Sequence, residues 1–158
     1  MPTNTQSMDY AGSTAPLLSE ILTKVNNAKM KEDKVKVLKQ NDSVPLRQVL
    51  KGAFDPKIVW DLPEGTPPYK ENEAPAGTEH TLLYTESKRL WHFVKGADNR
   101  TSKTRKEMLY IQMLEGLHAD EAKLLIAVKE KNLNSMYKGL TDAVVKEAFG
   151  WNDDYKTA

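Results

Sequence analysis

Apolar residues return every three or four positions along most of the chain, which is the spacing of amphipathic helices. The first stretch with this spacing runs from Leu17 to Ala28 and follows Pro16, a residue favoured in the first turn of a helix. Six further stretches have the same spacing: 30–40, 46–54, 82–97, 104–113, 120–131 and 142–149. The alternation of apolar and polar residues that marks strands is absent. The sequence therefore predicts an all-α protein, a compact bundle of six or seven helices.

Several helix ends carry their own signals. Thr104 and Glu107 are spaced as in a capping box, so a helix is expected to begin at Thr104. Thr141 is expected to cap the last helix. Gly150 is expected to end that helix, with Trp151 folding back onto its last turn.

One long segment, from about residue 61 to 78, has no helical spacing and contains four prolines and two glycines. We call it the proline-rich loop. Before it, Asp55 and Pro56 are expected to start a single helical turn that ends at Trp60. Large aromatic side chains are mostly buried, so we expect Trp60 to anchor the loop against the core. Loops this long are uncommon in compact domains and are often functional.

The chain of 158 residues has the length of one domain, enough to bury a core without disulfides or metal ions. Residues 1–15 are mostly small and polar, and we expect them to form a disordered leader. The helical domain is expected to span residues 16–151. Residues 152–158 are expected to form a tail.

The composition, 39% hydrophobic and 28% charged, is that of an ordinary globular protein. The absence of cysteine excludes disulfides, thiolate metal sites and cysteine nucleophiles. No apolar run approaches the roughly 18 residues of a membrane span, and the N-terminus lacks the basic and apolar regions of a signal peptide. We therefore expect a cytoplasmic protein without membrane contact.

Residues that would support catalysis are poorly arranged. The three histidines, His80, His92 and His118, do not have metal-ligand spacing. There is no glycine-rich phosphate loop. The acidic pairs are adjacent in sequence, so on a helix their side chains diverge. We expect neither an enzyme nor a cofactor.

Charge is unevenly distributed, although the net charge is only +1. Residues 88–106 contain seven basic residues and a single acidic one, Asp98. Residues 29–51 contain seven basic and three acidic residues, whereas residues 55–80 contain two and six. Such clusters can focus positive potential on one face for a polyanion, although runs of charge are also common on solvated helices.

A second candidate for anion binding precedes the last helix. Gly139-Leu140-Thr141 leads into a capped helix N-terminus, where free backbone N–H groups and a partial positive charge can hold a phosphate. Lys138 stands directly before it. Most turns of this kind bind nothing, so a plain connection between helices is the alternative.

The segment from Glu121-Ala-Lys-Leu-Leu through Lys131 to Lys138-Gly139-Leu140-Thr141-Asp142-Ala143-Val144 resembles the end of the helical N-terminal DNA-binding domain of ATP-dependent DNA ligases. Further segments are similar to that domain in its phage-type version: Leu17 to Lys39, Ala53-Phe54-Asp55-Pro56 to Trp60, Pro63-x-Gly65, and Arg89-Leu-Trp to Arg100-Thr-Ser. The resemblance covers roughly residues 16–151. It implies an all-α domain that grips duplex DNA across the minor groove through phosphates, independently of sequence.

The chain departs from the ligase pattern in two ways. It contains no Lys-x-Asp-Gly adenylation motif, so it would be the binding domain standing alone, without the catalytic core. Residues 132–137 lack the arginine-bearing turn usual in that family, which puts contacts at this turn in doubt.

Charge and resemblance together predict a non-catalytic, phage-encoded accessory protein that binds the backbone of double-stranded DNA, intact or nicked. The expected DNA-binding residues are Lys88, Arg89, Lys95, Arg100, Lys103, Arg105, Lys106, Lys131, Lys138 and Gly139. The alternative is a protein-interaction module, a phage accessory or virion component, that keeps the ligase-like fold. It would engage a protein partner through Trp60, Tyr69 and the proline-rich loop.

Overall fold

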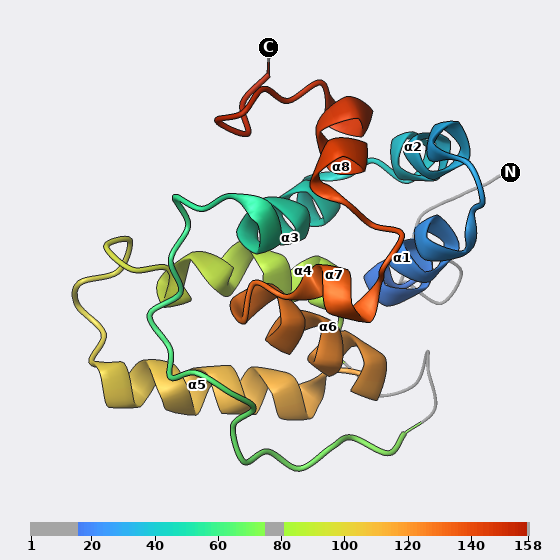
Figure 1. Ribbon diagram of the computed structural model, residues 1–158. Helices are drawn as coiled ribbons and strands as arrows, with labels where there is room; N and C mark the ends of the chain where they lie inside the picture. Colours follow the sequence, from blue (N-terminus) through green and yellow to red (C-terminus); the bar gives the residue numbers. More distant parts are fainter. Residues whose placement is uncertain (1–15, 75–80, 158) are drawn as a thin grey trace, which may run out of the picture.

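The computed structural model describes residues 16–74 and 81–157, which fold into α-helices and one 3-10 helix without a strand (Figure 1). Their bounds are α1 (Leu18–Asn27), α2 (Lys31–Gln40), α3 (Val44–Phe54), α4 (Leu83–Glu86), η1 (Ser87–Phe93), α5 (Lys103–Gly116), α6 (Ala119–Lys129), α7 (Leu133–Met136) and α8 (Asp142–Phe149). The predicted all-α bundle is confirmed. The number of helices exceeds the expected six or seven because α4 and α7 are separate turns of four residues each.

The bundle is organised around α6, seven of whose eleven residues are buried. This helix packs against α1, α3 and α5, and its Leu124, Leu125 and Val128 lie in the core. At its start, the Glu121 carboxylate accepts a hydrogen bond of 2.7 Å from the backbone N–H of Ser19. This contact joins α6 to the first turn of α1, and burial raises the pKa of the Glu121 carboxyl.

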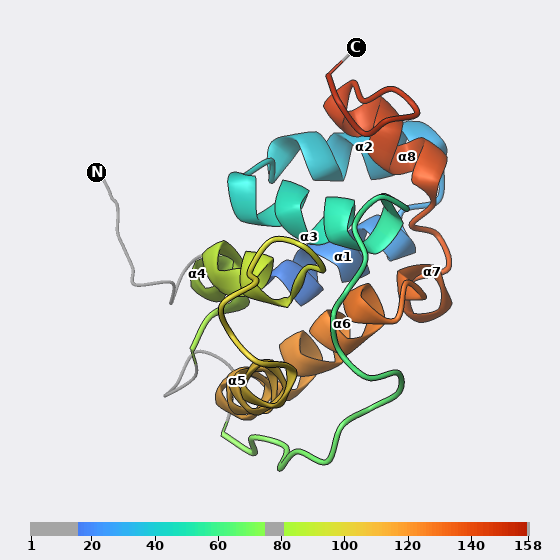
Figure 2. The ribbon, with the colours of Figure 1, turned by 90° about the vertical axis from the view of Figure 1, so that its left-hand side faces the viewer.

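Helix α2 packs against both α1 and α8, and Figure 2 shows α3 below α2 with α1 behind it. Ser43 ends the turn before α3 by accepting a hydrogen bond from the N–H of Leu46 at 3.2 Å. Thr141 caps α8 in the same way through the N–H of Val144, as predicted. The bundle therefore has α2 and α8 at one end and α5 at the other.

The helix predicted over residues 82–97 is broken into α4 and η1, which ends at Phe93. Buried residues of η1, namely Ser87, Leu90 and Phe93, recur every three positions, as a 3-10 helix requires. The chain then turns at Gly96, whose φ of +87° suits a glycine.

The start of α5 also differs from the prediction. Ser102 caps the helix by accepting a hydrogen bond from the N–H of Arg105 at 3.2 Å, so Thr104 lies inside the first turn and is not the N-cap. With this start, Lys106 and Tyr110 fall on the buried face of α5. Serine and threonine can both cap a helix, and the burial of this face of α5 favours Ser102 over Thr104.

The single helical turn expected after Asp55 is absent from the described structure, which has a non-helical turn there. The Asp55 carboxylate accepts a hydrogen bond from the N–H of Lys57 at 2.9 Å, which bends the chain out of helical geometry. Trp60 then forms an isolated antiparallel bridge with Val94. Its indole packs against the core as expected.

The described part of the proline-rich loop, residues 61–74, is held across α5 and α6 (Figure 2). The buried Lys129 amine donates hydrogen bonds to the carbonyl oxygens of Pro63 and Gly65, at 2.8 and 2.7 Å. Further along, the N–H of Lys70 donates to the Glu115 carboxylate at 2.7 Å. The loop is therefore an irregular but anchored layer.

Beyond α8, the chain folds back where a tail was expected. Gly150 adopts the left-handed conformation, and the N–H of Trp151 bonds to the carbonyl of Lys146 at 2.9 Å, as the predicted helix end requires. Tyr155 is buried, and its hydroxyl hydrogen-bonds to Asp142. Residues 152–157 thus pack on the domain, while the expected leader, residues 1–15, lies outside the described residues.

Candidate nucleic-acid interface

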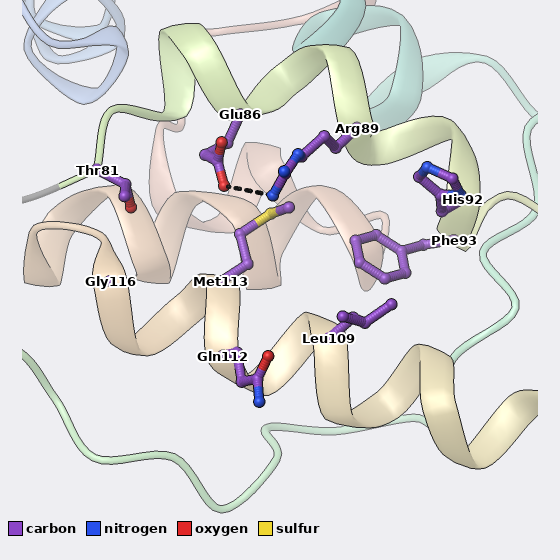
Figure 3. Close-up of a pocket in the computed structure, with 9 residues that line it drawn as sticks. All are labelled: Thr81, Glu86, Arg89, His92, Phe93, Leu109, Gln112, Met113 and Gly116. Atoms are coloured by element: carbon purple, nitrogen blue, oxygen red, sulfur yellow. Dashed lines mark ion pairs between the residues drawn. The ribbon is translucent and has the colours of Figure 1, made fainter. Parts of the chain in front are cut away.

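A cleft of about 420 Å³ lies between η1 and α5 (Figure 3). Its wall combines charged, polar and apolar side chains from the two helices and from the segment before α4. The lining residues are Thr81, Glu86, Arg89, His92, Phe93, Leu109, Gln112, Met113 and Gly116. Part of the cleft is formed by residues 88–106, the basic segment in which the sequence predicted DNA contacts.

The 3-10 geometry of η1 decides which side chains face this cleft. Side chains three residues apart eclipse one another, so Glu86, Arg89 and His92 form one row. The Arg89 side chain is 64% exposed, and its Nη1 lies 3.6 Å from Glu86 Oε1. This loose pair places the guanidinium at the cleft and leaves most of its surface open to a ligand.

The opposite wall comes from one face of α5. Leu109, Gln112 and Gly116 follow one another at helical spacing and all line the cleft. Arg105 lies one turn before Leu109 on the same face, and its side chain is exposed. The cleft therefore leads toward a second guanidinium at the start of α5.

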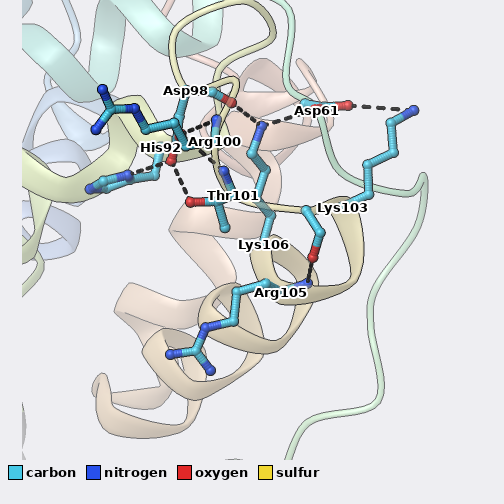
Figure 4. A network of polar contacts seen from close by, with 9 residues as sticks. Asp61, His92, Asp98, Arg100, Thr101, Lys103, Arg105 and Lys106 are labelled. Carbon is cyan, nitrogen blue, oxygen red and sulfur yellow. Dashed lines mark hydrogen bonds and ion pairs between the residues drawn. The ribbon is translucent and has the colours of Figure 1, made fainter.

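Asp98, the single acidic residue of the basic segment, is turned inward (Figure 4). Its carboxylate lies 2.9 Å from His92 Nδ1 and accepts a hydrogen bond of 2.8 Å from the Thr101 hydroxyl. The backbone N–H groups of Arg100 and Thr101 donate to the same carboxylate, at 3.0 and 3.2 Å.

These contacts to the ionised form, that of His92 above all, hold the pKa of the Asp98 carboxyl well below its usual range. The carboxylate stays charged, but its contacts are all to His92, Arg100 and Thr101 within the turn. The outward-facing cations of residues 88–106 are therefore not neutralised by the only acid in their own segment.

Three of the predicted contacts at this end of the molecule point in two directions. Arg100 and Arg105 extend to the side on which His92 lies, whereas Lys103 extends to the opposite side (Figure 4). The Lys103 amine lies 3.9 Å from Asp61 Oδ1. Arg89 lines the cleft together with His92 (Figure 3). We call Arg89, Arg100 and Arg105, with His92, the arginine face.

The sequence predicted that Lys106 contacts DNA, but the structure buries this side chain, which is only 3% exposed. Its amine donates to the carbonyl oxygen of Asp98 at 2.7 Å and lies 3.2 Å from Asp61 Oδ2. Both partners are internal to the fold, so the side chain joins α5 to the turn and to the proline-rich loop. It does not reach the surface.

Gly139 does not offer the free N–H group that the sequence suggested. Its N–H donates to Asn26 Oδ1 at 2.7 Å, so the predicted phosphate seat is filled by a side chain of α1. A Cβ at this position would lie 3.0 Å from the Asn26 carbonyl oxygen, which explains the glycine. Lys138 is exposed beside it.

Lys131 is exposed along part of its side chain, but its amine is committed within the fold. The amine donates to the carbonyl oxygen of Asp55 at 2.7 Å, and partial burial lowers its pKa. Neither Lys131 nor Lys138 lines the cleft, and the structure does not bring them together with the arginine face. Lys88 and Lys95 are exposed next to the cleft but do not line it.

Sequence reasoning missed His92, Gln112 and Met113 as lining residues. The available signal was the spacing of three residues between Arg89 and His92, which the structure shows to be that of a 3-10 helix. The pairing of His92 with Asp98 crosses a turn and has no local sequence pattern.

Trp60 and Tyr69, through which the alternative protein-interaction module would bind its partner, pack toward the core. The Trp60 indole N–H donates to the Gly52 carbonyl at 3.1 Å, and Tyr69 packs against the core, where burial raises its pKa. Within residues 16–74 and 81–157 no three metal-ligating side chains converge. In the same ranges no helix is long and apolar enough to cross a membrane.

Comparison with known proteins yields one relationship. No curated protein and no solved structure matches the chain, so the resemblance to the DNA ligase domain stays a prediction. A family model described as a family of unknown function, DUF6433, matches residues 21–135, which include the cleft and the whole arginine face. The chain belongs to the DUF6433 family.

Proposed function

We propose that this protein binds DNA through backbone phosphates at the arginine face and has no catalytic activity of its own. The observation that carries the proposal is the inward turn of Asp98, which leaves Arg100 and Arg105 without a neutralising acid from their own segment. Arg89 has only the loose contact with Glu86 at 3.6 Å. Guanidinium groups suit this role because their planar fork matches two phosphate oxygens at once.

Phosphate contacts carry no sequence information, so duplexes of different sequence should bind with similar affinity. The protein would act as an accessory that delivers or holds DNA for a partner enzyme, in keeping with the ligase-type resemblance. As a phage-encoded protein it would work in the host cytoplasm, where the DNA is.

The test is a binding titration with a short labelled duplex at low salt. Replacing Arg89, Arg100 and Arg105 together by Gln should weaken binding by about tenfold or more, because three charge-assisted phosphate contacts are lost. A matched control replaces Lys29, Lys36 and Lys39 by Gln. These lysines are also exposed, and their replacement removes the same amount of charge from the opposite end of the bundle.

The control variant should bind within about twofold of the wild type, because screened charges at a distance contribute little. Equal losses in both variants would mean that only net charge matters and would contradict a specific face. Absence of duplex binding by the wild type at low salt would overturn the proposal and favour a protein partner instead.

A further inference from the structure

The outer side of α4 and η1 carries exposed aromatic rings between cations. Among the residues described, six large hydrophobic side chains are exposed, and two of them are the aromatic residues Tyr84 and Trp91, at 52% and 49%. Lys88 is one helical turn after Tyr84 and three residues before Trp91, so it shares the side of the helix that bears both rings. Exposed aromatic rings beside a cation are the elements from which binding sites for single-stranded nucleic acid are built.

Trp91 is held in place by the same network that orders the arginine face. Its ring stacks on His92 with centroids 3.8 Å apart and an interplanar angle of 29°. His92 is in turn fixed by Asp98 at 2.9 Å. The indole is therefore pre-positioned while half of its surface stays open, which lowers the entropic cost of stacking a ligand on it.

We propose that an unpaired base of single-stranded DNA stacks on Trp91, with the adjoining phosphates held by Lys88 and Arg89. This inference rests on the proposed function and names its preferred substrate, a single-stranded segment. Aromatic rings interleaved with cations are how proteins hold single strands without reading sequence, since every base has a flat face. Lys88 is exposed and Arg89 has only a loose contact with Glu86 at 3.6 Å, so charge complementarity favours a polyanion with flat apolar groups over a purely apolar partner.

The experiment compares a labelled oligo(dT) with a duplex of the same length. Trp91→Ala should weaken oligo(dT) binding by about 5- to 100-fold, the effect expected for one lost stacking contact. Duplex binding should stay within about twofold, because paired bases are not available to the ring. Met30→Ala removes another exposed hydrophobic side chain, which lies directly before α2 at the other end of the bundle, and serves as the control, with both affinities unchanged.

Trp91→Phe keeps a stacking ring, and it tests the contact even where the alanine variant unfolds. It should bind oligo(dT) within about threefold of the wild type, since benzene rings also stack on bases. Intrinsic fluorescence adds a direct readout. Oligo(dT) should quench the wild type, and Trp91→Phe should lose that quenching although Trp60 and Trp151 remain.

The failure of this inference can be told apart from failure of the proposed function. Unchanged oligo(dT) affinity in Trp91→Ala, or quenching that persists in Trp91→Phe, would overturn the stacking contact while duplex binding through the arginines stands. If only the triple arginine variant lost affinity for oligo(dT), the stacking contact would likewise be overturned. A wild-type protein that binds neither DNA overturns both proposals.

Discussion

The indole N–H of Trp60 donates a hydrogen bond to the backbone carbonyl of Gly52, with the two heavy atoms 3.1 Å apart. This contact fastens the start of the proline-rich loop to the last turns of α3. It also requires close approach, because a Cβ at position 52 would lie 2.8 Å from Cζ2 of the Trp60 ring.

The first prediction concerns this contact. In most helices Gly→Ala is stabilising by about 0.5–1 kcal/mol, but Gly52→Ala should destabilise the protein by about 1–2 kcal/mol because the ring must move. Urea unfolding measures the change, with Gln48→Ala on the exposed side of α3 as control. A gain in stability for Gly52→Ala would show that the indole is not held where the structure places it.

The second prediction separates two lysines that face the same carboxylate. Lys106→Met should cost about 2–3 kcal/mol of unfolding free energy, because it leaves the Asp98 carbonyl and part of Asp61 unpaired inside the fold. Lys103→Met should cost less than about 0.5 kcal/mol, because that side chain is 84% exposed and its ion pair is screened. Thermal or urea unfolding of both variants checks the difference, and equal costs would contradict the buried role of Lys106.

The third prediction concerns acid. The pKa of Asp98 is lower in the folded than in the unfolded protein, so its ionised form stabilises the fold above its ordinary pKa near 3.8. That stabilisation should be lost progressively as the pH falls from about 5 toward 2. Asp98→Asn should lower the melting temperature at pH 7 and show a smaller further loss in acid than the wild type. If the melting temperatures of the wild type and of Asp98→Asn fell by the same amount across this pH range, the role assigned to Asp98 would be refuted.

The fourth prediction concerns the C-terminal turn. Tyr155 is buried against α8, so Tyr155→Ala should cost about 3 kcal/mol, as other large aromatic deletions do. Tyr155→Phe loses only the hydroxyl contact with Asp142 and should cost about 1 kcal/mol. Denaturant unfolding of the two variants measures these costs. If residues 152–157 were a mobile tail, neither substitution would change the free energy of unfolding.

Much of the fold is predictable from local patterns. The helical spacing of apolar residues located α1, α2, α3, α6 and α8, and the caps Thr141 and Gly150 are where the sequence placed them. These features depend on neighbours within four residues, which a single sequence displays directly.

The candidate site is less predictable because its members act across turns. Lys103 and Lys106 look alike in sequence, yet only the packing of α5 shows that one is exposed and the other buried. The role of Asp98 depends on His92, six residues away, and on a turn at Gly96. Counting charges identified the basic segment, residues 88–106, but could not show which of its side chains are exposed or to which side they extend.

The most direct test of the central claim is the salt dependence of duplex affinity. Each phosphate contact contributes a slope of about −0.9 to the logarithm of affinity against the logarithm of salt concentration. We predict a wild-type slope of about −3 or steeper, flattened by about 2 to 3 when Arg89, Arg100 and Arg105 are replaced by Gln. A slope that is the same in both proteins would contradict the claim that these three arginines contact the DNA backbone.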